Sequence, residues 1–169
     1  MVVLRFVLKT RSRDSLQRSF IRFLLSSLSA EANASASDKT AVDEIRRKQH
    51  RILVIDDDDR FRSSFCFRLT RKYGAQVTDV NSGRAGIERV RNGGSYDLVL
   101  TDIMMPEMTG VETYYELRKI DANIPIALMS AYSDSQEWKR AQELKDAVLI
   151  HKPVQEDALI KILSGLKQE

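Results

Sequence analysis

The sequence predicts an α/β fold in which five parallel strands form one sheet with helices packed on both faces. From residue 51 onward, short apolar runs alternate with segments of helical hydrophobic spacing. Three of the five runs contain almost no polar residue, which is typical of parallel strands covered on both sides. Polar residues follow several of these runs directly. In such a sheet, function gathers beyond the carboxyl ends of the strands.

The five apolar runs have the length and composition of β-strands. They are Ile52 to Ile55, Gln76 to Val80, Leu98 to Thr101, Pro125 to Met129 and Ala147 to Ile150. Because a helix-length segment separates each run from the next, we expect parallel strands joined by right-handed crossovers.

The helices between these strands have recognisable ends and apolar faces. The first is expected to end before Gly74, because glycine readily takes the left-handed conformation that closes a helix. The fourth is expected to open at Ser133, with Gln136 at the spacing of a capping box. Two helices place their apolar residues on one face, Phe61, Phe65 and Leu69 in the first and Leu159, Ile162, Leu163 and Leu166 in the last.

The composition is that of a globular protein. The chain has 169 residues, 43% hydrophobic and 30% charged, with room for one domain and an appendage. No apolar run approaches the ~20 residues needed to cross a bilayer. The single cysteine, Cys66, cannot form an internal disulfide and is expected to be a small buried residue. A reducing, cytoplasmic location is therefore expected.

Charge divides the chain into two parts. Residues 1–49 hold ten Lys or Arg and five Asp or Glu, a net charge of +5. Residues 50–169 hold 17 basic and 19 acidic residues, a net charge of −2. We therefore expect a basic leader and linker over 1–49 and a separate domain over 50–169. The pI near 9.0 belongs to the leader, so direct nucleic-acid binding is not expected.

The leader is open to several interpretations. Residues 1–29 carry six basic residues, one acid and six serines, with apolar residues at roughly helical spacing. This composition resembles an organellar transit peptide, in which case residues 1 to about 37 would address the chain to an organelle. The alternatives are a helix that binds a membrane surface or a partner, a poorly ordered tail, and an overextended start of translation. Residues 30–49 fit a linker, and His50 is expected to be part of it.

Polar residues at the predicted strand ends are the main functional signal. The first strand runs into Asp56 to Asp59, the third into Asp102, the fourth into Ser130, and the fifth is followed by His151 and Lys152. Carboxyl ends of parallel strands lie at one edge of the sheet, so these side chains are expected to converge.

Converging carboxylates repel one another and need a cation to neutralise them. Magnesium suits this role, because it accepts one or two carboxylates and several waters and leaves positions open for phosphoryl oxygens. A neighbouring carboxylate can attack phosphorus and form an acyl phosphate, while a lysine and a hydroxyl bind the remaining oxygens. The pattern therefore predicts phosphoryl transfer to an aspartate.

Each residue also has a simpler explanation. For Asp58 and Asp59 we favour a solvated loop that caps the next helix, and we expect His151 to have no catalytic role. Ser130 alone would be an ordinary small residue at a strand end, and Lys152 alone a surface lysine. Their combination favours a site over these separate explanations.

Four short segments of the sequence form a distinctive set: ILVIDD at Ile52 to Asp57, YDLVLTDIMMPEMTG at Tyr96 to Gly110, the pair Ser130-Ala131, and Lys152-Pro153. Together they closely resemble the CheY-like receiver domain of bacterial response regulators in two-component phosphorelay signalling. The resemblance covers about residues 50–167 and implies a flavodoxin-like, doubly wound five-stranded sheet of order 2-1-3-4-5 with five helices.

The resemblance also implies a metal site. Asp102 would be the phosphoacceptor and, with Asp57, a direct ligand of Mg²⁺, for which Mn²⁺ could substitute. Asp56 would act on the metal through water, and Met104 would offer its backbone carbonyl. The resemblance thus assigns all four positions to one magnesium centre.

The other implied roles are catalytic. Ser130 would move toward the phosphoryl group, Lys152 would pair with it, and the Lys152-Pro153 bond would be cis. The domain would not be a conventional enzyme, but it would catalyse its own phosphorylation and dephosphorylation. Dephosphorylation is expected to be slow, because Met104 and Tyr132 flank the pocket and limit the approach of water. The expected partners are a histidine kinase or histidine phosphotransfer protein and an unidentified downstream protein, with membrane contact only through the leader.

Two positions depart from the commonest receiver pattern. The usual glycine before the fifth strand is missing from Leu144 to Ala147, so the output face is expected to have a different shape. Leu149 stands three residues before Lys152, where many receivers have an aromatic residue that couples its rotamer to phosphorylation. The switch is therefore expected to depend more on Ser130 and on the segment from Ala131 to Leu144.

Two rival functions remain. Asp56 and Asp58 mimic the Asp-x-Asp motif of haloacid dehalogenase-type phosphohydrolases, in which Asp56 would be the nucleophile. That family expects Thr or Val where Arg60 stands, and a late acidic pair that is missing here. The second rival is a degenerate receiver that signals through binding alone, which is disfavoured because no site residue is missing.

Overall fold

Five parallel strands form a single sheet of order β2-β1-β3-β4-β5, as predicted. The computed structural model describes residues 37–144 and 146–166, and the part from Thr40 onward forms one compact unit. The strands are β1 (Arg51–Ile55), β2 (Gln76–Val80), β3 (Leu98–Asp102), β4 (Ile126–Ser130) and β5 (Ala147–His151). Each predicted strand agrees with the observed one to within one residue at either end.

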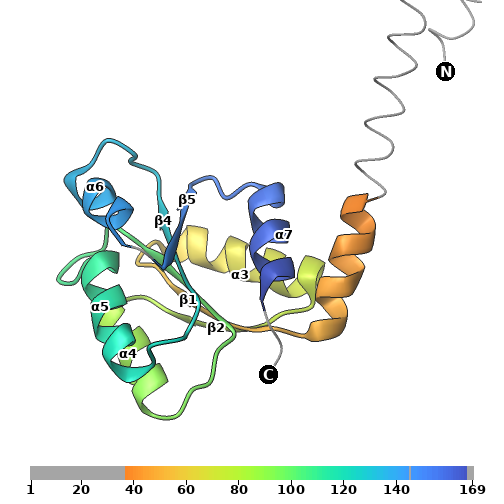
Figure 1. Ribbon diagram of the computed structural model, residues 1–169, viewed down its shortest axis with the longest axis horizontal. Coiled ribbons are helices and arrows are strands. Elements are labelled where there is room, and N and C mark those ends of the chain that lie inside the picture. Colours follow the sequence, from red (N-terminus) through yellow and green to blue (C-terminus); the bar gives the residue numbers. More distant parts are fainter. Residues whose placement is uncertain (1–36, 145, 167–169) are drawn as a thin grey trace, which may run out of the picture. The chain divides into compact units, whose positions relative to one another are not determined.

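Helices cover both faces of the sheet (Figure 1). Helices α3 (Asp59–Tyr73) and α7 (Glu156–Gly165) pack on one face, and α4 (Gly83–Arg91), α5 (Gly110–Ile120) and α6 (Gln136–Gln142) pack on the other. Strands β1, β3 and β4 contribute alternate residues to the two apolar cores. Their nearly continuous apolar sequences follow from this burial on both sides.

The ends of α3 are as the sequence predicts, whereas the start of α6 is not. Asp58 caps α3 by accepting hydrogen bonds from the backbone N–H groups of Arg60 and Phe61, and Gly74 closes it with φ 68°. The predicted opening of α6 at Ser133 is wrong. Ser135 caps that helix instead, and its hydroxyl also donates to the Tyr132 carbonyl, which places Ser133 in the preceding turn.

A sixth helix in the described chain differs from the predicted linker. Residues 40–48 of the compact unit are helical, and Ile45, 2% exposed, packs into the core beneath α3 and α7. Arg46 donates hydrogen bonds to the Arg71 and Lys72 carbonyls at the end of α3. The compact unit therefore begins ahead of the predicted boundary at residue 50, and His50 is buried rather than part of a linker.

The predicted leader helix and transit peptide lie in residues 1–36, outside the described part of the chain. Among the helices that are described, none has the length and apolar composition needed to span a bilayer.

We expect Gly110→Ala to lower the free energy of unfolding by about 2 kcal/mol, because the new methyl group would overlap backbone. An ideal Cβ at Gly110 would lie 2.2 Å from the Asp102 carbonyl oxygen and 2.9 Å from the Ile103 Cα. Chemical denaturation measures the change. Gly165→Ala is the matched control, since within the described residues no atom outside its own helix turn and chain neighbours lies within 4 Å of its Cβ position. Equal stability of Gly110→Ala and wild type would contradict this account.

Candidate functional site

An acidic cleft lies at the carboxyl-terminal edge of the sheet. Asp56 follows β1 and is completely buried, Asp102 ends β3 and is 5% exposed, and Asp57 faces solvent. The cleft has a volume of about 230 Å³. It is lined by every residue that the sequence predicted for the site: Asp56, Asp57, Asp102, Met104, Ser130 and Lys152.

Lys152 joins the two buried acids. Its Nζ lies 2.7 Å from Oδ2 of Asp56 and forms a second ion pair with Oδ1 of Asp102. The residue follows β5 directly, and its backbone N–H donates to the Ser130 carbonyl on β4 at 2.8 Å. The Lys152-Pro153 bond is cis, as predicted. Three strands thus bring two carboxylates and one ammonium group into direct contact.

Backbone N–H groups hold the opposite oxygen of each acid. The Met104 N–H donates to Oδ2 of Asp102 at 2.8 Å, and the Asp58 N–H donates to Oδ1 of Asp56 at 3.0 Å. Each carboxylate therefore has one oxygen on the backbone and the other on Lys152, which fixes its orientation.

The balance of charge sets the protonation of the site. Burial raises the pKa of Asp102 to about 6, and the neighbouring Asp56 carboxylate acts in the same direction against Lys152 and the Met104 N–H. Burial alone would lower the pKa of Lys152, but its hydrogen bonds and charge interactions with Asp102 and Asp56 outweigh burial and raise it. Lys152 is therefore cationic. Its single positive charge faces two acids, Asp56 and Asp102.

Ser130 supplies a buried hydroxyl at the end of β4. Its Oγ accepts a hydrogen bond from the Tyr132 N–H at 3.0 Å, and the side chain is almost fully buried. The hydroxyl lies on the wall of the cleft together with Ala131 and Tyr132. The Ser130 hydroxyl also donates to the Tyr132 carbonyl at 3.3 Å.

A family model described as the response regulator receiver domain matches residues 52–164. The chain belongs to the response regulator receiver family. The receiver is 36% identical over 108 residues to the transcriptional regulatory protein ZraR of Escherichia coli strain K12, a match that covers 64% of this chain and 24% of ZraR. It spans about a quarter of the length of the first curated relatives it matches.

Solved receiver structures share its fold. The Francisella response regulator 1452 receiver domain superposes with a TM-score of 0.58 at 28% identity, covering 68% of this chain and 96% of that chain. The receiver domain of sensor histidine kinase PA1611 from Pseudomonas aeruginosa PAO1 gives a TM-score of 0.59 at 23% identity, covering 68% and 93%. That neighbour was solved with a magnesium ion coordinated in its active-site cleft.

The oxygen donors of the receiver's cleft fit magnesium. Asp56, Asp57 and Asp102 line it with Met104, and Lys152 leaves their negative charge incompletely neutralised. In the described residues no three His, Cys, Asp or Glu side chains form a metal site on their own. Magnesium does not require such a cage, because it is commonly held by one or two carboxylates and keeps several waters.

The remaining strand-end residues have structural roles. Asp58 caps α3, as expected, and Asp59 pairs with Arg62. The His151 ring packs against the Trp138 indole, with ring centroids 4.3 Å apart, and does not line the acidic cleft. Asp58 also lines the cleft, but its carboxylate is engaged by backbone N–H groups at the start of α3.

Two further residues, which were not predicted from the sequence to belong to the site, support the cleft. Arg62 donates to the Asp56 carbonyl at 2.7 Å and to the Asp79 carboxylate at 2.9 Å, which ties the end of β1 to β2. The ring of Phe61 lies beneath the ammonium of Lys152. Both lie within three residues of the end of the acidic run, but their residue types alone do not distinguish them from ordinary helix residues.

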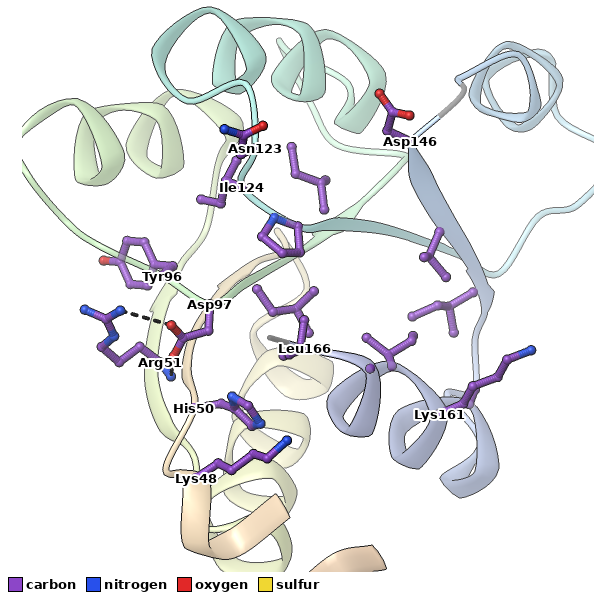
Figure 2. Close-up of a pocket in the computed structure, with 18 of the residues that line it drawn as sticks. Lys48, His50, Arg51, Tyr96, Asp97, Asn123, Ile124, Asp146, Lys161 and Leu166 are labelled. Carbon is purple, nitrogen blue, oxygen red and sulfur yellow. Dashed lines mark hydrogen bonds and ion pairs between the residues drawn. The ribbon is translucent and has the colours of Figure 1, made fainter. Parts of the chain in front are cut away.

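A larger hollow of about 1440 Å³ lies at the opposite edge of the sheet (Figure 2). Three of its acids have structural partners. Asp97 pairs with Arg51, Asp121 accepts from the backbone of the residues after it, and Asp157 accepts from the Ala158 N–H. Buried His50 also lines this hollow, and burial lowers its pKa. The hollow lacks the paired acids and lysine of the cleft and is not the candidate site.

Proposed function

We propose that the receiver accepts a phosphoryl group from a phosphohistidine donor onto Asp102, in a magnesium-dependent reaction, and then changes its affinity for a downstream protein. The observation that carries the proposal is the contact of Lys152 with Asp102 and Asp56, which come from separate strands. It agrees with the role of receiver domains in two-component signalling.

The chain's own residues account for the chemistry. An Asp102 carboxylate oxygen bonds to phosphorus as the bond from phosphorus to the donor histidine nitrogen breaks, and that nitrogen keeps the electron pair. Lys152 stays protonated and donates a hydrogen bond to one phosphoryl oxygen. The Ser130 hydroxyl binds a second phosphoryl oxygen. Magnesium held by Asp57, Asp102, the Met104 carbonyl and, through water, Asp56 would offset the charge of the transferring group, and Mn²⁺ could substitute.

The phosphorylated state is expected to be long-lived. Met104 and Tyr132 are exposed at the mouth of the cleft, where their side chains limit the approach of water to phosphorus. The receiver therefore catalyses its own phosphorylation and only a slow loss of the group. A phosphoryl lifetime of only seconds in the purified protein would contradict this part of the proposal.

The switch is proposed to run through β4 and β5. Leu149, at the position where an aromatic rotamer would be expected, packs against the core that α4, α5 and α6 cover. Movement of Ser130 toward the phosphoryl group would instead alter the loop that leads into α6, because Ser130 accepts from the Tyr132 backbone. The downstream surface would then include α6 and the neighbouring edge of β5.

The donor and location complete the proposal. A histidine kinase or histidine phosphotransfer protein would dock on α3, beside the cleft. We also propose a cytoplasmic location, with which the free thiol of Cys66 agrees. We expect no direct contact between this domain and nucleic acid.

Phe67→Ser is expected to slow transfer from a phosphohistidine protein about tenfold, because an exposed aromatic side chain is a frequent binding hot spot. Phe67 lies on α3 and is 67% exposed. Phosphorylation by acetyl phosphate, which needs no protein docking, should keep its rate. Ile120→Ser on α5 is the matched control, since it removes an exposed apolar side chain from the other face of the sheet. Equal slowing in both variants would contradict docking on α3.

The acceptor is tested directly by chemical trapping. The wild-type protein is incubated with acetyl phosphate and magnesium and then reduced with borohydride, which converts an acyl-phosphorylated aspartate to homoserine. Peptide mass spectrometry should find homoserine at position 102. Modification at position 56 would support the hydrolase alternative, and no modification with or without magnesium would support a receiver that only binds.

A further inference from the structure

Two stacked phenylalanine rings of α3 connect Lys152 to the loop that follows it. The Lys152 Nζ lies 4.2 Å from the centroid of the Phe61 ring, and Phe61 stacks on Phe65 at 5.1 Å with 25° between the ring planes. The Arg68 guanidinium lies 5.2 Å from the Phe65 ring centroid and donates to the Val154 carbonyl at 2.9 Å. The rings therefore link the head of Lys152 to the backbone two residues beyond it.

The Phe61 ring affects Lys152 differently from the acids. A lysine side chain has four methylene groups and loses considerable conformational freedom when it is held in one place. Asp56 and Asp102 hold its ammonium from one side, and the face of the Phe61 ring attracts it without adding negative charge to the cleft. The ring also keeps water from that side of the ammonium.

We propose that Phe61 is a positioning residue for phosphoryl transfer, which holds the Lys152 ammonium at Asp102 before the donor arrives. This inference rests on the proposed function. As the Asp102 oxygen bonds to phosphorus, the leaving group departs with the electron pair of the broken bond, and Lys152 keeps its proton. The ammonium then exchanges a hydrogen bond to Asp102 for one to a phosphoryl oxygen. Because the Phe61 ring already holds it in place, no further conformational freedom is lost at that step.

Apolar packing alone would not need an aromatic residue at this position. Phe65 is the buried member of the pair and belongs to the core, whereas Phe61 is only partly buried and lines the cleft. A leucine at position 61 would preserve most of the packing but would offer no π face. Packing and positioning therefore predict different results for a series of graded aromatic replacements.

The test incorporates phenylalanines of increasing ring fluorination at position 61 and measures the rate of phosphorylation by acetyl phosphate at fixed magnesium. Fluorination weakens attraction to a cation while nearly preserving shape, so the rate should fall step by step. Phe61→Leu should be about fivefold slower than wild type, and Phe61→Tyr should keep nearly the full rate. The same fluorinated phenylalanines at the exposed position of Tyr115 on α5, compared with Tyr115→Phe, are the matched control and should leave the rate unchanged.

Proton NMR of the unphosphorylated, magnesium-free protein gives a second readout. The ring should shift the Lys152 ε-methylene protons upfield, and Phe61→Leu should remove that shift while thermal unfolding shows the variant to be folded. A flat fluorination series, or the absence of the upfield shift in wild type, would overturn the inference. Failure of wild type to take phosphate at Asp102 would overturn the proposed function instead, whatever the position of the NMR signal.

Discussion

Asp102→Asn is expected to abolish phosphorylation by acetyl phosphate, a loss of at least about a thousandfold, because an amide has no carboxylate oxygen to attack phosphorus. Phosphate-affinity electrophoresis or radiolabel incorporation measures the effect. Asp56→Asn is the informative control, since Asp56 shares the contact with Lys152 but is not the proposed nucleophile. It should retain slow labelling at Asp102. Loss of label in Asp56→Asn with full labelling of Asp102→Asn would reverse the assignment.

The same variant should make the magnesium-free fold more stable. The folded-state pKa of Asp102, about 6, lies above its ordinary value of 3.8, so the folded protein binds that proton more tightly than the unfolded chain. The ionised group is therefore destabilising above about pH 6, and this effect disappears below about pH 4. Removing the charge should raise the free energy of unfolding by about 3 kcal/mol at pH 7.5.

Denaturation in the presence of a chelator, at pH 7.5 and pH 4, checks this sign. Asp57→Asn is a suitable comparison because Asp57 is exposed and should change stability less. A stabilisation by Asp102→Asn that was equally large at both pH values could not come from the carboxylate charge.

Lys152→Met should have the largest effect on stability. It removes the ammonium from two buried carboxylates, and loss of one partner from a buried ion pair typically costs about 3 kcal/mol or more. The variant should also be phosphorylated at least about tenfold more slowly, since no cation from the chain would meet the phosphoryl oxygens. Chemical denaturation in a chelating buffer and acetyl phosphate labelling measure the two effects.

The destabilisation by Lys152→Met should depend on pH in a defined direction. Without the lysine the carboxyl pKa of Asp102 rises further, so the loss of stability should be full at pH 8 and should shrink as Asp102 becomes protonated at lower pH. Lys161→Met, on the exposed side of α7, should have little effect at any pH. A destabilisation that grew on acidification would contradict the pairing of Lys152 with Asp102.

Much of the fold could be predicted because a parallel strand that is buried on both faces has an almost entirely apolar sequence. Strands β1, β3 and β4 read as apolar runs, and the polar residue that ends each run marks the edge of the sheet. Asp102 and Ser130 could be placed in one site by this rule alone, since adjacent parallel strands end together.

Other features left too little signal in the sequence. The helical residues 40–48 bury only Ile45 fully, among charged neighbours, so their apolar periodicity is too short to distinguish from a linker. The start of α6 was ambiguous because Ser133 and Ser135 are both good caps, and tertiary packing selects the second. Phe61 carries an apolar helix pattern whether its ring faces the core or the lysine of the cleft.

The attachment of Arg46 to the end of α3 has a practical consequence for preparing the domain. A fragment cut at residue 50, where the family resemblance begins, would lack Ile45 and would leave the Arg71 and Lys72 carbonyls without their guanidinium donor. The helix proposed to receive the phosphodonor would then fray at its far end. Recombinant versions meant for kinetic or NMR work should therefore begin no later than residue 40.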